Sequence, residues 1–296
     1  MQILAGVGAG SPSYTYHVFT SSGTLTVTSG GSLALCTVGG GGGSGHNIAG
    51  GGGGGELDLF ANFTVSANLT ITVGSGGARS TSDGTKGSNG GTSSVVEVST
   101  THQSALGGGG SGSAGAGQAD GETGGSGGGG AYAGPGAGGS ASGSNTFAGG
   151  AGFSSGQSLG GGGGGATAVG LTNPNPTGGQ GYALTSIDAN LTSANFPTTL
   201  TGKTHVSSGG GGAYYIAVDT NGPQAGGTNA GTGEYNSSIR AIAATSPTSY
   251  GCGGGGGGGF TANVGTAGFA GVVIIKYLTG LVTASGGQET ITGLPA

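Results

Sequence analysis

Uninterrupted runs of glycine are the feature that most restricts what this chain can fold into. A glycine costs about 1 kcal/mol more than an alanine in the interior of an α-helix, so these runs oppose helix formation wherever they occur. The strict three-residue period of collagen is also missing, because the glycines come in blocks. The blocks of four to seven glycines occupy 39–43, 50–55, 107–110, 127–130, 160–165, 209–212 and 253–259.

These blocks are either ordered or flexible linkers. Glycine makes up 83 of the 296 residues, and such a share on its own is typical of disordered, low-complexity sequence. Disordered segments, however, usually combine a high net charge with few apolar residues. This chain has only 5 basic and 10 acidic residues, and 32% of its residues are apolar. We therefore favour ordered packing over flexible linkers.

Backbone has to fill much of the interior, because the chain has no tryptophan and only 9 tyrosines and 8 phenylalanines. A polyproline II helix has three residues per turn and no internal hydrogen bonds. Segments of this kind that lack Cβ atoms can lie side by side and exchange N–H···O=C bonds with neighbours all around. The sequence therefore predicts a mainly β and irregular fold, in which β-strands frame a bundle of packed polyglycine II helices with almost no α-helix.

Strands are expected where β-branched and aromatic residues gather between the glycine blocks. We also expect a hairpin turn at 66–68, a surface loop at 74–92 and a short tail at 278–296. The expected strands are 14–19, 23–28, 32–38, 63–65, 69–73, 93–98 and 268–277.

No linker or change of composition divides the chain convincingly into independent domains. We predict one glycine-rich unit over 1–296. Within it, 1–105 is the β-strand-rich part, 106–270 is the polyglycine II core with inserted loops, and 271–296 holds the closing strand and tail.

The chain shows no convincing pattern of catalytic or cofactor-binding residues. Its 4 histidines lie far apart in the sequence, without the close spacing of metal ligands. Nucleotide-binding glycine motifs match by chance at this glycine density, and none follows a strand and opens a helix. Glu56 and Asp58 could share one face of a strand, but such a pair is more often an edge-strand charge than an acid/base dyad. We predict no enzymatic activity, no cofactor and no metal.

Charge and hydropathy restrict the partners and the location. A net charge of −5 gives no electrostatic footprint for nucleic acid. No run of 18 apolar residues exists, so membrane insertion is not expected, and the N-terminus does not look like a secretion signal. Cys36 and Cys252 are expected to be small buried residues, with a bridge between them as the alternative. The sequence predicts synthesis in a cytoplasm, so any extracellular role requires another route of exit.

Two insertions between the glycine blocks, 171–207 and 213–250, are richer in composition. Their aromatic residues are candidates for receptor contact, because tyrosine offers a large contact area at low entropic cost and stacks on sugars. The alternative is that these rings cover the ends of the glycine bundle against water. The candidates are Phe196, Tyr214, Tyr215, Tyr235 and Tyr250; burial between layers is expected instead for Tyr132, Phe147 and Phe153.

The residues 17–27 (HVFTSSGTLTV), followed by 35–43 (LCTVGGGGG), resemble the opening of the glycine-rich domain found in many phage tail proteins. Residues 69–77, 91–95 and 268–277 are similar to the later strands of that domain. More distantly, the alternation of glycine blocks and insertions resembles the tail-fibre adhesins of T-even-type phages. Those adhesins pack polyglycine II helices in layers and display variable loops from one end. This chain departs from them by its larger share of expected strand and by lacking a recognisable fibre-attachment module.

The resemblance implies a virion protein, a tail-fibre or adhesin component that binds a host surface glycan or outer-membrane protein through its loops. Other virion proteins would be its further partners, and a homo-oligomer is compatible with this role. A second hypothesis is a self-assembling structural protein, such as an extracellular fibril subunit or a capsid decoration, because low charge and strand edges favour polymerisation. A third, an ice-binding protein, is disfavoured by the irregular spacing of the glycine blocks.

Overall fold

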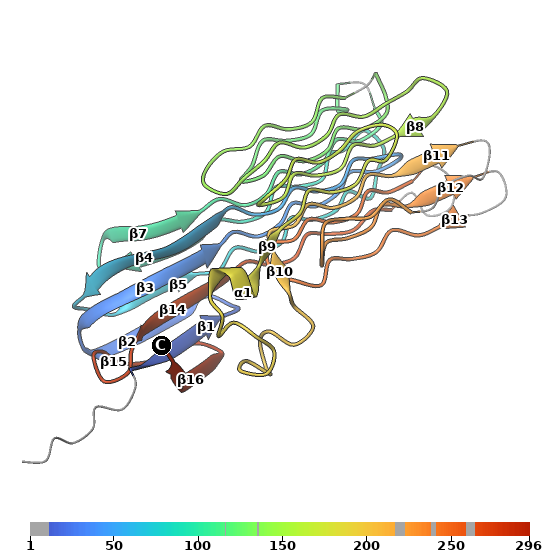
Figure 1. Cartoon of the computed structure of the whole chain (residues 1–296). Coiled ribbons are helices and arrows are strands. Elements are labelled where there is room, and N and C mark those ends of the chain that lie inside the picture. Colours follow the sequence, from blue (N-terminus) through green and yellow to red (C-terminus); the bar gives the residue numbers. More distant parts are fainter. Residues whose placement is uncertain (1–11, 116, 135, 217–222, 238–240, 259–263) are drawn as a thin grey trace, which may run out of the picture.

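The computed structural model describes residues 12–115, 117–134, 136–216, 223–237, 241–258 and 264–296. The molecule is elongated, with two β-sheets at one end, a small sheet at the other and long extended segments between them (Figure 1). The single helix of the described part, α1 (Leu184–Ile187), has four residues. The predicted mainly β and irregular fold with almost no helix is confirmed.

Two five-stranded sheets pack face to face at one end of the molecule, which we call the base (Figure 1). The first sheet has the order β16-β1-β14-β3-β4, and the second has the order β15-β2-β5-β6-β7. The strands of the first sheet are β1 (Ser13–Phe19), β3 (Gly31–Val38), β4 (Leu57–Val65), β14 (Val272–Leu278) and β16 (Glu289–Pro295). Those of the second sheet are β2 (Gly23–Ser29), β5 (Leu69–Thr72), β6 (Ser93–Glu97), β7 (Thr100–Ala105) and β15 (Thr283–Ser285).

Strand β14 shows how one sequence serves two cores. Successive side chains of a strand point to opposite faces of its sheet. Val273 and Ile275 face the second sheet, in a core with Leu25, Leu69 and other apolar side chains of both sheets. Val272 and Ile274 face the other way, into a separate core on the outer face of the first sheet. The continuous apolar run of β14 is therefore explained by burial on both faces.

The outer face of the first sheet is covered by residues 182–206, which comprise β9 (Tyr182–Ala183), α1 and β10 (His205–Val206). This segment, which we call the cover, buries five apolar side chains against the sheet: Leu184, Leu191, Phe196, Leu200 and Val206. Most of the insertion 171–207 is thus a packed layer rather than a free loop.

The glycine segments join side by side through backbone hydrogen bonds with a period of three residues. In segment 39–44, residues 39 and 42 donate to 50–56, residues 40 and 43 donate to 87–91, and residues 41 and 44 donate to 266–269. The N···O distances of these six bonds are 2.8–3.1 Å. The same segment accepts bonds from three other neighbours, 77–80, 108–111 and Gly254. Six neighbours and a period of three are what packed polyglycine II helices would give, and that conformation stays our interpretation.

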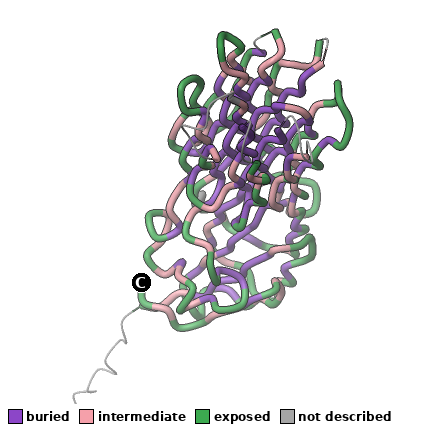
Figure 2. The backbone as a smooth tube through the Cα atoms, turned by 90° about the vertical axis from the view of Figure 1, so that its right-hand side faces the viewer, coloured by how far each residue is buried: buried purple, intermediate pink, exposed green. Residues whose placement is uncertain are grey.

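Segment 50–56 repeats this arrangement inside the bundle. It donates in turn to 161–164, 251–254 and 106–109, and it accepts bonds from 39–42, 126–129 and Gly210. Figure 2 shows that the middle of the bundle is buried although it has almost no side chains. We call this hydrogen-bonded bundle the glycine lattice. Because 39–56 and 74–91 belong to it together with later segments, position 105 does not separate a strand-rich part from a glycine part.

Three local expectations need correction. Residues 66–68 form no hairpin, since β4 lies in the first sheet and β5 in the second, so the turn connects two sheets. The segment 74–92 lies at the surface but is a loop only over 81–86, because 77–80 and 87–91 bond to the lattice. The segment 278–296 is not simply a tail: it contributes β15 and β16, and β16 pairs with β1 along the sheet edge. The physical reason in each case is a long-range backbone pairing.

Glu97 at the end of β6 holds the turn between the two sheets. One carboxylate oxygen accepts the N–H groups of Ser66 and Ala67, both at 2.7 Å, and the other lies 3.0 Å from His102 Nε2. The hydrogen bond from Ser66 N–H is the largest cause that lowers the pKa of Glu97, to about 2. The carboxylate is therefore stabilised in its charged form by the folded chain.

We expect Glu97 to make folding stability depend on acidic pH. A carboxyl group with a lowered folded pKa contributes stability above its ordinary pKa of 4.5, and that stability is lost as pH falls toward 2. Replacing Glu97 by Gln should therefore cost roughly 1–2 kcal/mol at pH 7 and flatten the stability profile between pH 4.5 and 2. Urea unfolding at several pH values measures this, and an unchanged slope in the variant would contradict the assignment.

Candidate functional site

The five aromatic candidates occupy different environments, and four of them are inside the protein. Phe196 is fully buried in the cover and contacts Tyr16 edge to face, with ring centroids 5.6 Å apart. Tyr250 is 5% exposed, donates its hydroxyl to the carbonyl of Thr199 at 2.8 Å and packs on Phe269. Burial raises the pKa of Tyr250 to about 12. These two rings have almost no surface left for a receptor.

Tyr214 and Tyr235 hold together the small sheet at the far end, opposite the base. That sheet has the order β13-β12-β11-β8, and the two tyrosines are paired neighbours whose rings stack with centroids 5.7 Å apart. Both are fully buried, whereas Tyr215 is half-buried. The alternative that rings cover the end of the glycine bundle fits Tyr214 and Tyr235. The four strands of this small sheet are β8 (Ser158–Leu159), β11 (Tyr214–Ile216), β12 (Tyr235–Ser237) and β13 (Ala241–Ile242).

The three rings expected between layers also differ from one another. Phe153 is partly buried and packs against the Tyr214 and Tyr235 cluster, and Tyr132 is half-buried in a turn. Phe147 is 38% exposed, which contradicts the expected burial. The reason is that segment 145–149 lies at the rim of the glycine lattice, where no further layer covers it.

A hollow does form where the two insertions meet, beside β9 and β10. It has a volume of about 580 Å³, and we call it the waist hollow. Tyr182 and His205 come from the two short strands of the cover, which pair antiparallel. Gln180 precedes β9, and Thr228 comes from the second insertion. The residues that line it are Thr167, Gln180, Gly181, Tyr182, Ala183, Ser186, His205 and Thr228.

The waist hollow combines ring faces with neutral hydrogen-bonding groups. Tyr182 is half-buried and packs partly on the core under the cover, so its ring is held in place. The side-chain amide oxygen of Gln180 (Oε1) accepts the N–H and the hydroxyl of Thr228, both at 3.1 Å, which ties the two insertions together. Aromatic faces with amide and hydroxyl groups suit the stacking and hydrogen bonding of a sugar ring. Sequence reasoning missed Tyr182 and His205, although both lie in the insertion 171–207.

A second, smaller hollow adjoins the first and shares two of its residues, Ala183 and His205. Its volume is about 200 Å³, and we call it the lysine hollow because Lys203 lines it. Its remaining lining consists of Leu184, Thr185, Leu191, Thr192, Ser193 and Thr204.

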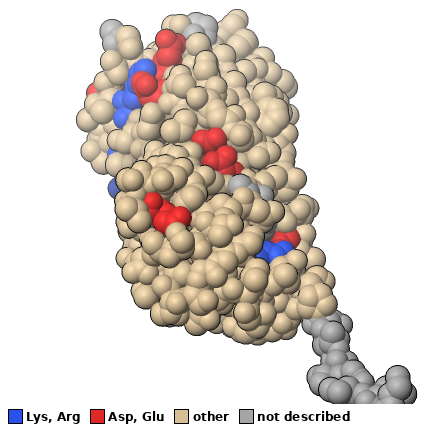
Figure 3. Space-filling view, turned by 90° about the vertical axis from the view of Figure 1, so that its left-hand side faces the viewer, with Lys and Arg blue, Asp and Glu red and all other residues tan. Residues whose placement is uncertain are grey.

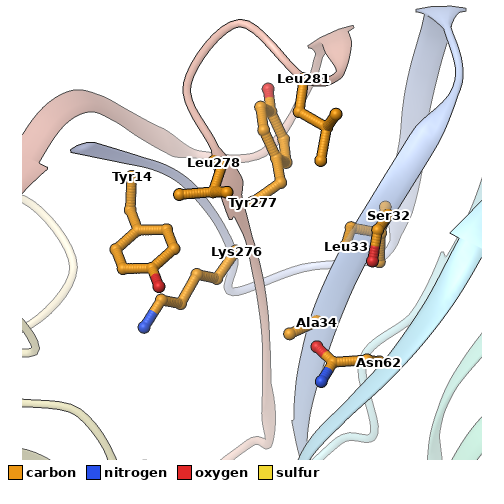
Figure 4. A pocket seen from close by; sticks show the side chains of 9 residues that line it. All are labelled: Tyr14, Ser32, Leu33, Ala34, Asn62, Lys276, Tyr277, Leu278 and Leu281. Carbon is orange, nitrogen blue, oxygen red and sulfur yellow. The ribbon is translucent and has the colours of Figure 1, made fainter. Parts of the chain in front are cut away.

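A third hollow lies on the base and is less suited to a polar ligand. It has a volume of about 440 Å³ and lies between β1, β14 and the β3–β4 pair (Figure 4). Lys276 is already paired with Asp188 at 2.6 Å, and its ammonium lies 3.9 Å from the centre of the Tyr14 ring. Leu278 and Leu281 are 40% and 46% exposed. The charge of Lys276 in this hollow is therefore neutralised, and the exposed side chains that line the hollow are apolar.

The carboxylate pair of the sequence analysis has a structural explanation. Glu56 is 5% exposed, and its two oxygens accept the backbone N–H groups of Leu106 at 2.8 Å and Ser144 at 2.7 Å. These bonds fix three chain segments where the glycine lattice meets the base. Asp58 is half-buried, and burial followed by the nearby Glu56 raises the pKa of Asp58 to about 6.

We expect Asp58 to lower stability at neutral pH. Because its folded pKa is above the ordinary 3.8, protonation favours the folded state, and stability should fall as pH rises from about 4 through 6. Asp58 keeps contact with water, so the effect is limited to about 1 kcal/mol. Asp58→Asn should therefore be more stable than the wild type above pH 6 and equal to it near pH 3. Urea unfolding at pH 3 and pH 8 tests this, and equal stability at pH 8 would contradict it.

The other chemistry-bearing residues are dispersed. Among the described residues no three His, Cys, Asp or Glu side chains come together as metal ligands would, and no helix there could span a bilayer. Cys36 and Cys252 are both buried and free, as expected for small interior residues. Figure 3 shows that charged side chains are few and scattered on the face it presents.

The architecture and its glycine lattice define a glycine-rich, mainly β protein. The model of the family described as glycine-rich domain matches residues 19–278, so the chain belongs to this family. The match begins at the end of β1 and ends at the end of β14, and so contains the lattice, the cover and the waist hollow. A comparison with curated proteins gives no significant match.

Proposed function

We propose that this chain is a recognition protein of a virus particle, a component of a phage tail fibre or of its adhesin tip. It binds a host surface glycan or outer-membrane protein, with the glycan as the better fit to the waist hollow. Other virion proteins are its remaining partners, and the virion is its location. The resemblance of the strand and glycine landmarks to phage tail proteins supports this proposal.

The observation that carries the proposal is the meeting of two insertions in one hollow. Gln180, Tyr182 and His205 come from the first insertion, and Thr228 comes from the second. They are fixed by the cover on one side and by the lattice on the other, since Gly179 and Gly227 both bond to lattice residues. A rigid frame that holds polar and aromatic side chains from separate segments lowers the entropic cost of binding.

The test is binding of the purified protein to a panel of intact bacteria. Tyr182→Ala should weaken binding to a recognised strain by about tenfold, because a ring face is the main apolar contact of the hollow. Tyr132→Ala is the matched control, since Tyr132 is also half-buried but does not line the hollow. Equal binding by wild type and Tyr182→Ala would show that the hollow is not the contact, and absence of binding to every strain would oppose the recognition role.

One observation favours the alternative of a self-assembling structural protein. Phe147, Val169 and Leu171 are 38%, 47% and 49% exposed. They lie on neighbouring segments, since Gly170 N–H donates to the carbonyl of Ala148. Exposed apolar side chains on the rim of a lattice could continue the packing into a second copy. Electron microscopy separates the two functions, because long regular filaments without cell binding would favour polymerisation.

A further inference from the structure

The waist hollow and the lysine hollow meet at one residue pair. His205 and Ala183 are paired neighbours in the two short strands of the cover, and both residues line both hollows. A ligand longer than one sugar unit can therefore occupy the two hollows at once. The first offers Tyr182 and amide and hydroxyl groups, and the second offers a cation.

Lys203 is held at the second hollow by aromatic rings rather than by a carboxylate. Its ammonium lies 5.1 Å from the centre of the Tyr250 ring and 5.9 Å from that of Phe269, within the range of cation–π attraction. It forms no ion pair with any residue that the structure describes. This contrasts with Lys86, which is 2.6 Å from Glu122, and with Lys276, which is paired with Asp188.

The surroundings of Lys203 suit an anion. No aspartate or glutamate is among the described residues that line either hollow, although acidic residues outnumber basic ones by 10 to 5 in the chain. Thr185 and Ser193 are exposed and bring hydroxyl groups to the same hollow, and both could donate to an anionic oxygen. An ammonium held in place, with hydroxyl donors in the same hollow and no carboxylate among its described lining residues, favours a negatively charged group.

We propose that the two hollows together bind an anionic surface polysaccharide. A sugar ring stacks on Tyr182 in the waist hollow, and a uronate carboxylate or phosphodiester on the adjacent unit pairs with Lys203 in the lysine hollow. This inference rests on the proposed recognition function and specifies its ligand class. It identifies Lys203 as the residue that makes the protein prefer anionic over neutral polymers.

The experiment uses the full chain on an array of purified bacterial surface polysaccharides. The array holds uronate-containing, phosphodiester-linked and neutral polymers, and each uronate polymer is also present with its carboxyl groups reduced to alcohols. We expect binding to at least one anionic polymer. For a uronate polymer, binding should fall about tenfold on carboxyl reduction, since a charge-assisted contact is lost. It should also weaken as ionic strength rises.

Matched variants separate the charge from the fold. Lys203→Gln should lose about tenfold in affinity for the anionic polymer, Lys203→Arg should retain most of it, and Lys86→Gln should leave it unchanged. The same net charge change at Lys86 controls for general electrostatics, and urea unfolding of each variant controls for stability.

Several results would overturn the proposal. They are binding only to neutral polymers, binding to no anionic polymer, or equal affinity of wild type and folded Lys203→Gln for the anionic polymer. Binding to intact bacteria distinguishes failure of the anionic-ligand proposal from failure of the proposed recognition function. A protein that binds bacteria equally well with and without Lys203 retains the recognition role and loses only the anionic ligand.

Discussion

Replacing Gly52 by alanine is expected to prevent folding or to lower the free energy of unfolding by more than about 3 kcal/mol. A Cβ atom at this position would lie 2.1 Å from the carbonyl oxygen of Gly42 and 2.6 Å from its carbonyl carbon. Both obstacles are backbone, and Gly42 is itself bonded to Gly53 at 2.8 Å, so neither segment can move aside without breaking lattice bonds. Urea unfolding followed by circular dichroism measures the loss.

Gly23→Ala is the matched control for this substitution. Gly23 lies on an exposed part of β2, and a Cβ there would meet only Phe19 ring atoms at 3.6 and 3.8 Å, an ordinary contact. Its stability should change by less than about 0.5 kcal/mol, since alanine also loses less backbone entropy than glycine. If Gly52→Ala and Gly23→Ala proved equally stable, the close packing of the lattice would be refuted.

Replacing Phe196 by alanine is expected to cost about 3–4 kcal/mol, because the ring is fully buried between the cover and the first sheet. The cavity would remove one of the two edge-to-face partners of Tyr16 and loosen the contact of residues 182–206 with the sheet. Hydrogen exchange should increase in this segment more than in β3 or β14. The measurement is urea unfolding combined with residue-level hydrogen exchange.

The comparison variant is Phe147→Ala, in which the lost ring is 38% exposed at the rim of the lattice. We expect a change in stability below about 1 kcal/mol for this variant. The variants at Phe196 and Phe147 also distinguish a core-packing role of Phe196 from a receptor-contact role. A variant that unfolds like the wild type but no longer binds cells would mean that the Phe196 ring contacts a receptor directly, against its interior position.

Seven of the ten strands of the base were predictable, at least in part, because their residues alternate or are uniformly apolar over short runs. The expected ranges 14–19, 23–28, 32–38 and 93–98 match β1, β2, β3 and β6 within one residue at either end. β15 and the short strands β8 to β13 were not expected, and neither were β7 and β16, since TTHQSA is polar and ETITGLP contains glycine and proline. Those two strands form because a partner strand is available beside them, which local propensity does not record.

The candidate site was only partly predictable. The sequence correctly indicated that 171–207 and 213–250 differ from the glycine blocks, and the waist hollow is lined mainly by residues of these two insertions. It did not distinguish rings that face water from rings that face a core. Phe196 and Tyr250 are buried because the first insertion folds back over the first sheet, and Tyr182 faces a hollow because it sits at the edge of that cover.

By itself the sequence determined that helix is nearly absent, that strands stand beside glycine blocks and that backbone must fill the space between them. These follow from the missing Cβ atoms and from the apolar runs, which are local properties of the chain. Only the tertiary structure decided which glycine segments neighbour one another, which faces of the sheets are covered and that the hollow lined by Lys203 adjoins the hollow lined by Tyr182. Those choices depend on hydrogen bonds between residues far apart in the sequence, such as that of Gly41 with Phe269, and identical glycines carry no information about their partners.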